Sequence, residues 1–294
     1  IDQAIQHAIK LNGANRLAEA ESLLNKIVKQ FPNNAYALHL LGVVMHRLGK
    51  TKNAISWLNK AINCSPKEAH FYSIAGEMYR TVGALTEAIS YGEKAVEFNA
   101  KSPVFFSNLG LAYFDSQEFE KAESNQIKAL KLDPNHIPAL NNLAGVFQKR
   151  AEVAIAEQHY KRVLALAPNH VEAMINYGAL LTELHRIDEA IPLFKAALSI
   201  QPSSAAAHTN IAIAFFAIEQ YDAATFGFDQ ALNINPSFFN ALTGSAKLCL
   251  ETKDPKQALT KIEKAISIIE LVEKTLPLNP NSPVKIEFGN DRVF

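Results

Sequence analysis

The sequence repeats itself every 34 residues. Prolines recur at this spacing, interrupted only by Ala100, and two further series hold only alanine or only glycine and alanine. The members of the three series are Pro32, Pro66, Pro134, Pro168, Pro202 and Pro236; Ala20, Ala54, Ala88, Ala122, Ala156, Ala190, Ala224 and Ala258; and Ala8, Gly42, Gly76, Gly110, Ala144, Gly178, Ala212 and Ala246. So regular a period predicts a stack of small repeated units rather than two globular domains.

Each half of the period has a helical pattern. Apolar residues stand three or four apart, as in Phe106, Leu109 and Tyr113, which is the spacing of one face of a helix. A glycine in mid-helix costs about 1 kcal/mol relative to alanine, so its recurrence needs a packing reason. Two helices that approach closely leave no room for a larger side chain where they cross. We therefore expect the glycine and alanine series to mark that crossing.

These residues resemble the tetratricopeptide repeat (TPR) family. The resemblance rests on a small residue at repeat position 8, alanine at positions 20 and 27, proline at position 32 and mostly large residues at positions 4, 7, 11 and 24. The sequence departs from this pattern at Gly92 and Gln126, at Val163 for alanine, and at His7, Ala75 and Ser245 for leucine. It covers residues 1–272 as the repeats 1–34, 35–68, 69–102, 103–136, 137–170, 171–204, 205–238 and 239–272. The resemblance implies an all-α, right-handed superhelical solenoid of about eight helix-turn-helix repeats, with a concave groove lined by the first helices.

The end of the chain departs from the repeat. Glu270 stands where a closing proline is expected, so the last helix is predicted to run on to about Thr275. Pro277, Pro280 and Pro283 then exclude a helix. We interpret residues 273–294 as a helix extension followed by a tail or linker, with the start of a second domain as the alternative. The weak motifs of repeats one and eight predict polar-faced caps at both ends.

Composition excludes several classes of function. Lys and Arg number 29, as do Asp and Glu, so the net charge is zero and a nucleic-acid partner is not expected. No apolar run reaches the roughly 18 residues of a membrane span. Two cysteines cannot build a disulfide framework, and we expect Cys64 and Cys249 to be buried free thiols. Free thiols favour a cytoplasmic location.

The most informative candidates are four asparagines in one register. The resemblance implies that positions 2, 5, 6, 9, 12 and 13 face the groove, and position 6 holds Asn108, Asn142, Asn176 and Asn210, here called the asparagine ladder. A carboxamide can donate and accept hydrogen bonds, so each can pair with a peptide backbone. Packed helices stand about 8–10 Å apart, which matches roughly three residues of an extended chain. The ladder therefore predicts a groove for extended peptides. The alternative is that these amides cross-link neighbouring helices.

Other predicted groove residues are secondary. They are the polar residues Ser107, Asn141, Gln148 and Thr209, the rim charges Asp115, Lys149 and Glu183, and the aromatic residues Tyr36, His39 and His70. No carboxylate or cysteine joins these histidines at a ligand spacing, so no metal site is predicted. The rim charges have the alternative role of a solvated face.

The sequence contains no motif for catalysis, and no cofactor is expected. We predict a non-catalytic protein-interaction scaffold that binds extended peptides. The ladder also resembles the groove of the TPR arm of O-linked N-acetylglucosamine transferases, which implies an alternative role as the substrate-recruiting arm of a larger protein-modifying transferase. A homo-oligomer formed through the solenoid ends is a further possibility.

Overall fold

The computed structural model describes the backbone of residues 1–275 and the side chains of residues 1–270. The predicted tail, residues 276–294, lies outside the described part. Every regular element in the described part is a helix, and the helices are α1 (Asp2–Gly13), α2 (Leu17–Gln30), α3 (Ala35–Arg47), α4 (Thr51–Cys64), α5 (Ala69–Thr81), α6 (Leu85–Phe98), α7 (Pro103–Asp115), α8 (Phe119–Leu132), α9 (Ile137–Lys149), α10 (Val153–Leu166), α11 (Val171–Glu183), α12 (Ile187–Ile200), α13 (Ala205–Ala217), α14 (Tyr221–Ile234), α15 (Phe239–Glu251) and α16 (Pro255–Thr275). The predicted all-α solenoid of eight helix pairs is confirmed, and α16 extends to Thr275 as expected.

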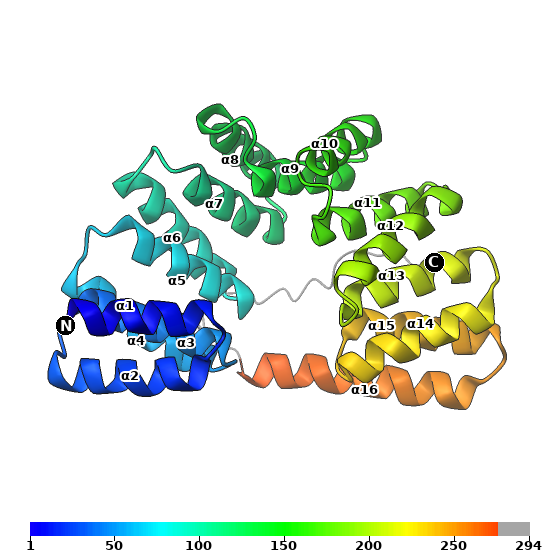
Figure 1. The fold of residues 1–294 in the computed structure, drawn as a ribbon. Helices are drawn as coiled ribbons and strands as arrows, with labels where there is room; N and C mark the ends of the chain where they lie inside the picture. Colours follow the sequence, from blue (N-terminus) through cyan, green and yellow to red (C-terminus); the bar gives the residue numbers. More distant parts are fainter. Residues whose placement is uncertain (276–294) are drawn as a thin grey trace.

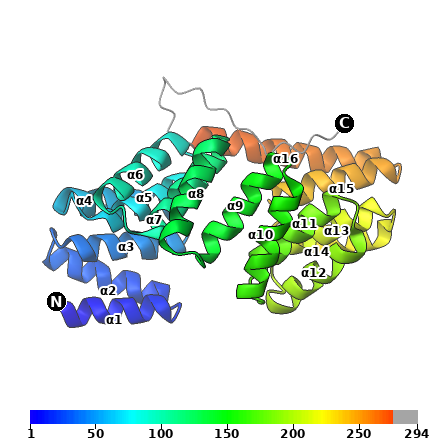
Figure 2. The ribbon, with the colours of Figure 1, turned by 90° about the horizontal axis from the view of Figure 1, so that it is seen from above.

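The pairs follow one another along a curved path. Figure 1 shows an arch that runs from α1 to α16, and Figure 2 shows the same array from above. Each odd-numbered helix contacts the next odd-numbered helix, whereas no two even-numbered helices of the described part contact each other. The odd-numbered helices therefore form the inner, concave side of the arch, as the resemblance implied. None of the described helices is long and apolar enough to cross a membrane.

Helices within a pair pack closely at the predicted small residues. A Cβ atom added to Gly178 in α11 would lie 2.6 Å from the ring of Phe194 in α12, which is fully buried. At Gly110 in α7, the same atom would lie 2.5 Å from the amide nitrogen of Gln126, also fully buried. The small residues are therefore required by the approach of the second helix.

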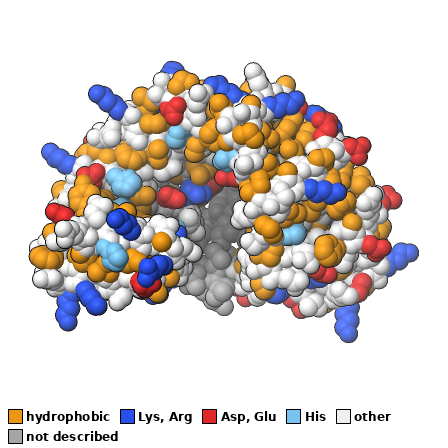
Figure 3. Space-filling model, viewed as in Figure 1, with side chains coloured by type: hydrophobic (Ala, Val, Ile, Leu, Met, Phe, Trp, Pro, Cys, Tyr) orange, Lys and Arg blue, Asp and Glu red, His pale blue; other side chains and the backbone are white. Residues whose placement is uncertain are grey.

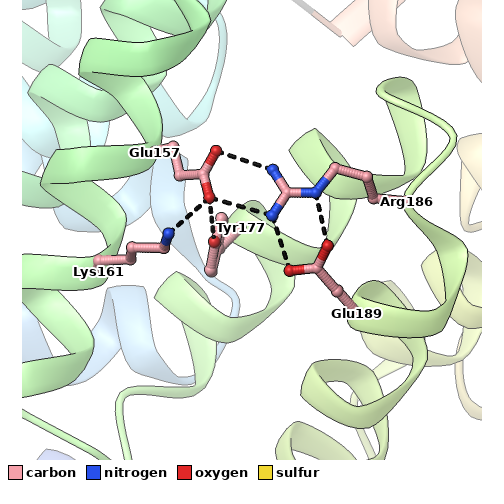
Figure 4. A network of polar contacts seen from close by, with 5 residues as sticks. All are labelled: Glu157, Lys161, Tyr177, Arg186 and Glu189. Carbon is pink, nitrogen blue, oxygen red and sulfur yellow. Dashed lines mark hydrogen bonds and ion pairs between the residues drawn. The ribbon is translucent and has the colours of Figure 1, made fainter.

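A network of polar side chains joins the repeat of α9 and α10 to the repeat of α11 and α12. Arg186, just before α12, contacts Glu157 of α10 at 2.9 Å and Glu189 at 2.7 Å. Glu157 also accepts hydrogen bonds from Lys161 and from the hydroxyl of Tyr177, each at 2.8 Å (Figure 4). The hydrogen bond from Arg186, followed by those from Lys161 and Tyr177, lowers the pKa of Glu157 to about 2. This network links α10, α11 and α12.

The two ends of the solenoid differ. The exposed residues of α1 are mostly polar and include Gln3, His7 and Lys10, although Ile9 is 44% exposed, so this end is largely but not wholly polar. At the other end, Ile262 and Ile266 of α16 are 38% and 48% exposed. In the preceding seven repeats, the residue in the register of Ile262 is buried. The expectation of a polar cap on repeat eight is therefore wrong, because α16 leaves an apolar face without a covering helix in the described part.

The packing of the glycines gives a matched pair of substitutions. Gly145→Ala in α9 should raise the free energy of unfolding by about 0.5–1 kcal/mol, because its nearest neighbours would be 3.8 Å away. Gly178→Ala should lower it by about 1–3 kcal/mol, because the added methyl group would lie 2.6 Å from the fully buried ring of Phe194, which would have to shift. Urea denaturation followed by circular dichroism measures both, and equal effects at the two positions would contradict the packing argument.

The Glu157 network predicts a pH-dependent stability. A carboxyl group whose pKa is lowered on folding stabilises the fold above its unfolded pKa, and this stabilisation is lost as the pH falls. Glu157→Gln should therefore lower the melting temperature at neutral pH, and the deficit should shrink as the pH falls from about 4.5 to about 2. Glu97→Gln in α6, an exposed carboxylate outside any described ion pair, is the control. A deficit for Glu157→Gln that does not change with pH would contradict this account.

Candidate peptide-binding surface

The candidate site is the inner surface of the arch, which the odd-numbered helices line. Figure 3 shows the molecule hollowed at the centre of this view, between the two sides of the arch. All four asparagines of the ladder are half-buried, one on each of α7, α9, α11 and α13. Their position on helices that contact each other along the inner side places the four amides in one row.

Three amides of the ladder are already bonded to the preceding odd-numbered helix. Asn108 Nδ2 donates to Ser73 Oγ at 3.1 Å, and Asn142 Nδ2 donates to Ser107 Oγ at 3.4 Å. Asn176 Nδ2 donates to Asn141 Oδ1 at 3.4 Å. Two of these three distances exceed the usual 2.7–3.2 Å or so of a protein hydrogen bond. The alternative interpretation, cross-linking of neighbouring helices, is thus present in the structure, although the bonds are long.

The carboxamides keep unused hydrogen-bonding capacity. Each of these three uses one N–H group of Nδ2, and no described residue donates to its Oδ1 atom. A carboxamide has two donor hydrogens and an acceptor oxygen, so one N–H group and the oxygen remain for a ligand. This pair of groups is what a single peptide unit needs.

Asn210 differs from the other three. The residue in the acceptor position of the preceding helix is Ile175, which offers no side-chain acceptor. Asn210 accordingly makes no side-chain hydrogen bond to any described residue. Its side chain is half-buried, so part of the amide is open to solvent. The helix-linking role therefore does not account for an asparagine at this position.

Three of the secondary candidates are buried below the ladder. Ser107, Asn141 and Thr209 are 1%, 3% and 2% exposed. Ser107 and Asn141 accept from ladder amides, and Thr209 donates to the carbonyl oxygen of Ala205 in its own helix. Ser107 and Asn141 thus support ladder amides from beneath, and the burial of all three side chains differs from the expectation that they add groups to the open groove.

Two of the three predicted rim charges are bonded to side chains of the neighbouring inner helix. Asp115 lies 2.7 Å from Arg80 of α5, and Glu183 accepts from the amide of Gln148 at 2.8 Å. Lys149 is exposed and forms no ion pair with a described residue. The predicted rim charges therefore connect adjacent helices on the inner side, and Lys149 alone stands open to solvent among them.

Aromatic rings gather where the N-terminal repeats line the inner surface. The ring of Phe71 lies 5.6 Å from that of Tyr36 and 4.8 Å from that of His39. His70 lies 5.1 Å from His39 and 6.5 Å from Phe105 of α7. We call these five residues the aromatic cluster. It joins the three predicted residues Tyr36, His39 and His70 into one continuous set.

His39, the less exposed histidine of the aromatic cluster, is neutral. Burial, and to a lesser extent the neighbouring His70, lowers the pKa of His39 to about 4, so its ring is neutral at physiological pH. Its Nε2 atom is buried and has no hydrogen-bond partner among the described residues. The hydroxyl of Tyr36 approaches Glu68 at 3.4 Å. Apart from this edge, the cluster presents ring surfaces rather than charges.

Phe71 and Phe105 were not among the residues predicted from the sequence. Both occupy repeat position 3, which holds a buried alanine in repeats two, five, six, seven and eight. The sequence signal that could have identified them is the replacement of alanine by phenylalanine at this position in two successive repeats.

The histidine, cysteine and acidic side chains elsewhere in the described part are the remaining candidates for metal ligands and reactive groups. In the described part, no group of three or more histidine, cysteine, aspartate or glutamate residues is arranged to bind a metal ion. Cys249 is buried, as expected, whereas Cys64 is exposed. The prediction for Cys64 is wrong because it is the last residue of α4, where the helix reaches solvent.

Comparison with known families agrees with this architecture. Family models described as tetratricopeptide repeat match residues 11–77, 105–136, 137–203 and 181–237. Together they cover more than half of the sequence, and the chain belongs to the tetratricopeptide repeat family. No curated protein sequence matches it.

Several solved structures share the fold. A structure of the APC/C hetero-tetramer Cut9–Hcn1 aligns with a TM-score of 0.67 and 19% identity over 88% of this chain and 52% of that one. A tetratricopeptide repeat protein from Parabacteroides merdae aligns with a TM-score of 0.64 and 20% identity over 82% of this chain and 96% of that one. Yeast Tom70 aligns with a TM-score of 0.63 and 18% identity over 88% of this chain and 58% of that one. The chain thus spans about half the length of the Cut9–Hcn1 chain. At these identities the likeness shows the fold alone.

Proposed function

We propose that this protein is a non-catalytic interaction scaffold that binds an extended peptide segment along the inner surface of the arch. The asparagine ladder binds the backbone of that segment, one peptide unit at each amide. The observation that supports this most directly is Asn210, a half-buried amide in the ladder register that has no internal partner among the described residues. Backbone binding of this kind accepts many side-chain sequences.

The internal bonds of the ladder are compatible with this role. A bond from the preceding helix holds each of Asn108, Asn142 and Asn176 in place while its oxygen stays free. Holding a binding group in its bound orientation reduces the entropy lost on association. The bonds between helices therefore prepare the ladder for a ligand.

The first test removes two amides at the centre of the ladder. Asn142→Ala with Asn176→Ala should weaken peptide binding by about 1–3 kcal/mol, because backbone groups of the ligand lose their partners. The ligand is obtained by capturing proteins on the wild type and on this variant, followed by mass spectrometry, and a peptide from a captured protein is titrated by fluorescence anisotropy. Asn63→Ala with Asn233→Ala, two exposed asparagines on α4 and α14, is the matched control.

Asn210→Ala separates the two interpretations of the ladder. Since Asn210 has no internal hydrogen bond in the described part, the substitution should leave the melting temperature unchanged and still weaken peptide binding. A ladder that only links helices predicts no effect on binding at this position. Unchanged affinity for Asn210→Ala and for the central double variant would exclude the ladder from recognition.

The transferase alternative has no support from the three solved structures named above, whose descriptions mention no transferase. It is tested by the reading frame that surrounds this sequence, since a catalytic domain beyond Phe294 would favour it.

We also propose that copies of the chain associate weakly through α16. Its exposed Ile262 and Ile266 offer an apolar face, whereas the exposed residues of α1 are mostly polar apart from Ile9, which disfavours head-to-tail stacking. Ile262→Lys with Ile266→Lys should abolish concentration-dependent dimerisation in light scattering, and Ile9→Lys on α1 should not. A wild type that is monomeric at all concentrations would contradict this proposal.

A further inference from the structure

We propose that the aromatic cluster binds one aromatic side chain of the same segment whose backbone the asparagine ladder binds. This inference rests on the proposed function and adds a specificity to it. It divides the inner surface into a part that binds a side chain, mainly on α3 and α5, and a part that binds the backbone, on α7 to α13.

The exposure of the cluster makes it available to a ligand. Tyr36 is 58% exposed and His70 is exposed, whereas Phe71 and Phe105 beneath them are 0% and 8% exposed. The buried rings thus form a base that fixes the exposed ones. Val104 of α7, in the same register as Tyr36 and His70, is 46% exposed and continues the apolar surface by one helix.

The exposed rings of Tyr36 and His70 can each contact a further ring. Tyr36 and His70 occupy the same register on neighbouring inner helices, which stand about 8–10 Å apart. Aromatic rings interact favourably when their centroids are about 4.5–7 Å apart. A ligand ring that contacts either exposed ring at this distance therefore gains an aromatic contact, and the two rings stand on adjacent helices along the inner surface.

The cluster and the ladder are continuous. The contact between His70 and Phe105 leads into α7, the helix that carries Asn108. Position 6, which holds asparagine from α7 onward, is Leu40 in α3 and Ile74 in α5. The backbone-binding amides therefore begin where the aromatic cluster ends, and one helix spacing, or about three extended residues, separates the two parts.

The charge of the cluster selects the class of side chain. The ring of His39 is neutral at physiological pH, and among the described residues the only carboxylate bonded to the cluster is Glu68, at the hydroxyl of Tyr36. Glu68 lies at one edge, next to the first ring of the series. A neutral aromatic side chain, which contacts several rings at once, fits this surface better than a charged one.

The test uses synthetic peptides of a Ser/Thr host sequence about twelve residues long, which spans α5 and the four helices of the ladder. One peptide is entirely polar, two carry a single phenylalanine at the first or the last position, and two carry lysine there. Fluorescence anisotropy measures each with the wild type. One of the phenylalanine peptides should bind about 2- to 10-fold more tightly than the polar peptide, and its identity gives the orientation of the bound segment.

The variants assign that preference to the cluster. Tyr36→Ser with His70→Ser should abolish the preference for phenylalanine, and circular dichroism checks that the fold is intact, which the exposure of both residues favours. The control is Phe226→Ser, which removes an aromatic side chain that is 65% exposed on α14 and should keep the preference. His70→Ser alone is a milder variant, and it should reduce the preference.

The outcomes distinguish the two proposals. Equal affinities for the polar and phenylalanine peptides, or tighter binding of a lysine peptide, overturn this inference and leave the ladder in place. If Asn142→Ala with Asn176→Ala changes no affinity while the phenylalanine preference persists, the backbone-binding proposal fails and the aromatic site stands. Absence of binding by any peptide at about 1 mM overturns both.

Discussion

The close approach of two helices at one small residue is the contact on which the rest of this structure depends. At Gly178 the ring of Phe194 occupies the space that a side chain would take, and the same arrangement recurs at Gly110 with Gln126. Because the contact recurs every 34 residues, each pair of helices adds to the last in the same way. The odd-numbered helices then contact one another and the even-numbered ones do not, so the array bends around its inner side.

That bend determines which side chains meet along the inner surface. Residues one period apart lie on neighbouring helices, so a polar residue at position 5 contacts position 6 of the next repeat, as Ser73 and Asn108 do. The same rule brings Arg80 to Asp115 at the rim. A repeat fold thus converts a spacing in the sequence into a row in space, and a row of equivalent groups suits a ligand that is itself a repeating polymer, such as a peptide backbone.

The sequence was sufficient to predict the fold, because glycine, alanine and proline at fixed positions each have one physical explanation. It also located the ladder, since asparagine is a poor residue in a helix interior. It did not reveal that Ser107 and Asn141 are buried beneath the ladder, because burial depends on the angle between neighbouring helices. The aromatic cluster was only half predicted: Tyr36, His39 and His70 follow from the groove register, whereas Phe71 and Phe105 reach it from the buried face of α5 and α7.

The internal hydrogen bonds of the ladder are weak and leave part of each amide free for a ligand. A hydrogen bond contributes only about 0.5–1.5 kcal/mol net when water competes for both groups, and the bonds of Asn142 and Asn176 are long at 3.4 Å. A ligand does not have to break them, since each amide retains an oxygen and one N–H group. At Asn210 the neighbouring Ile175 removes even this internal bond. An asparagine thus stands at the position where its contribution to the fold is smallest, which is the physical argument behind the proposed role of the ladder in recognition.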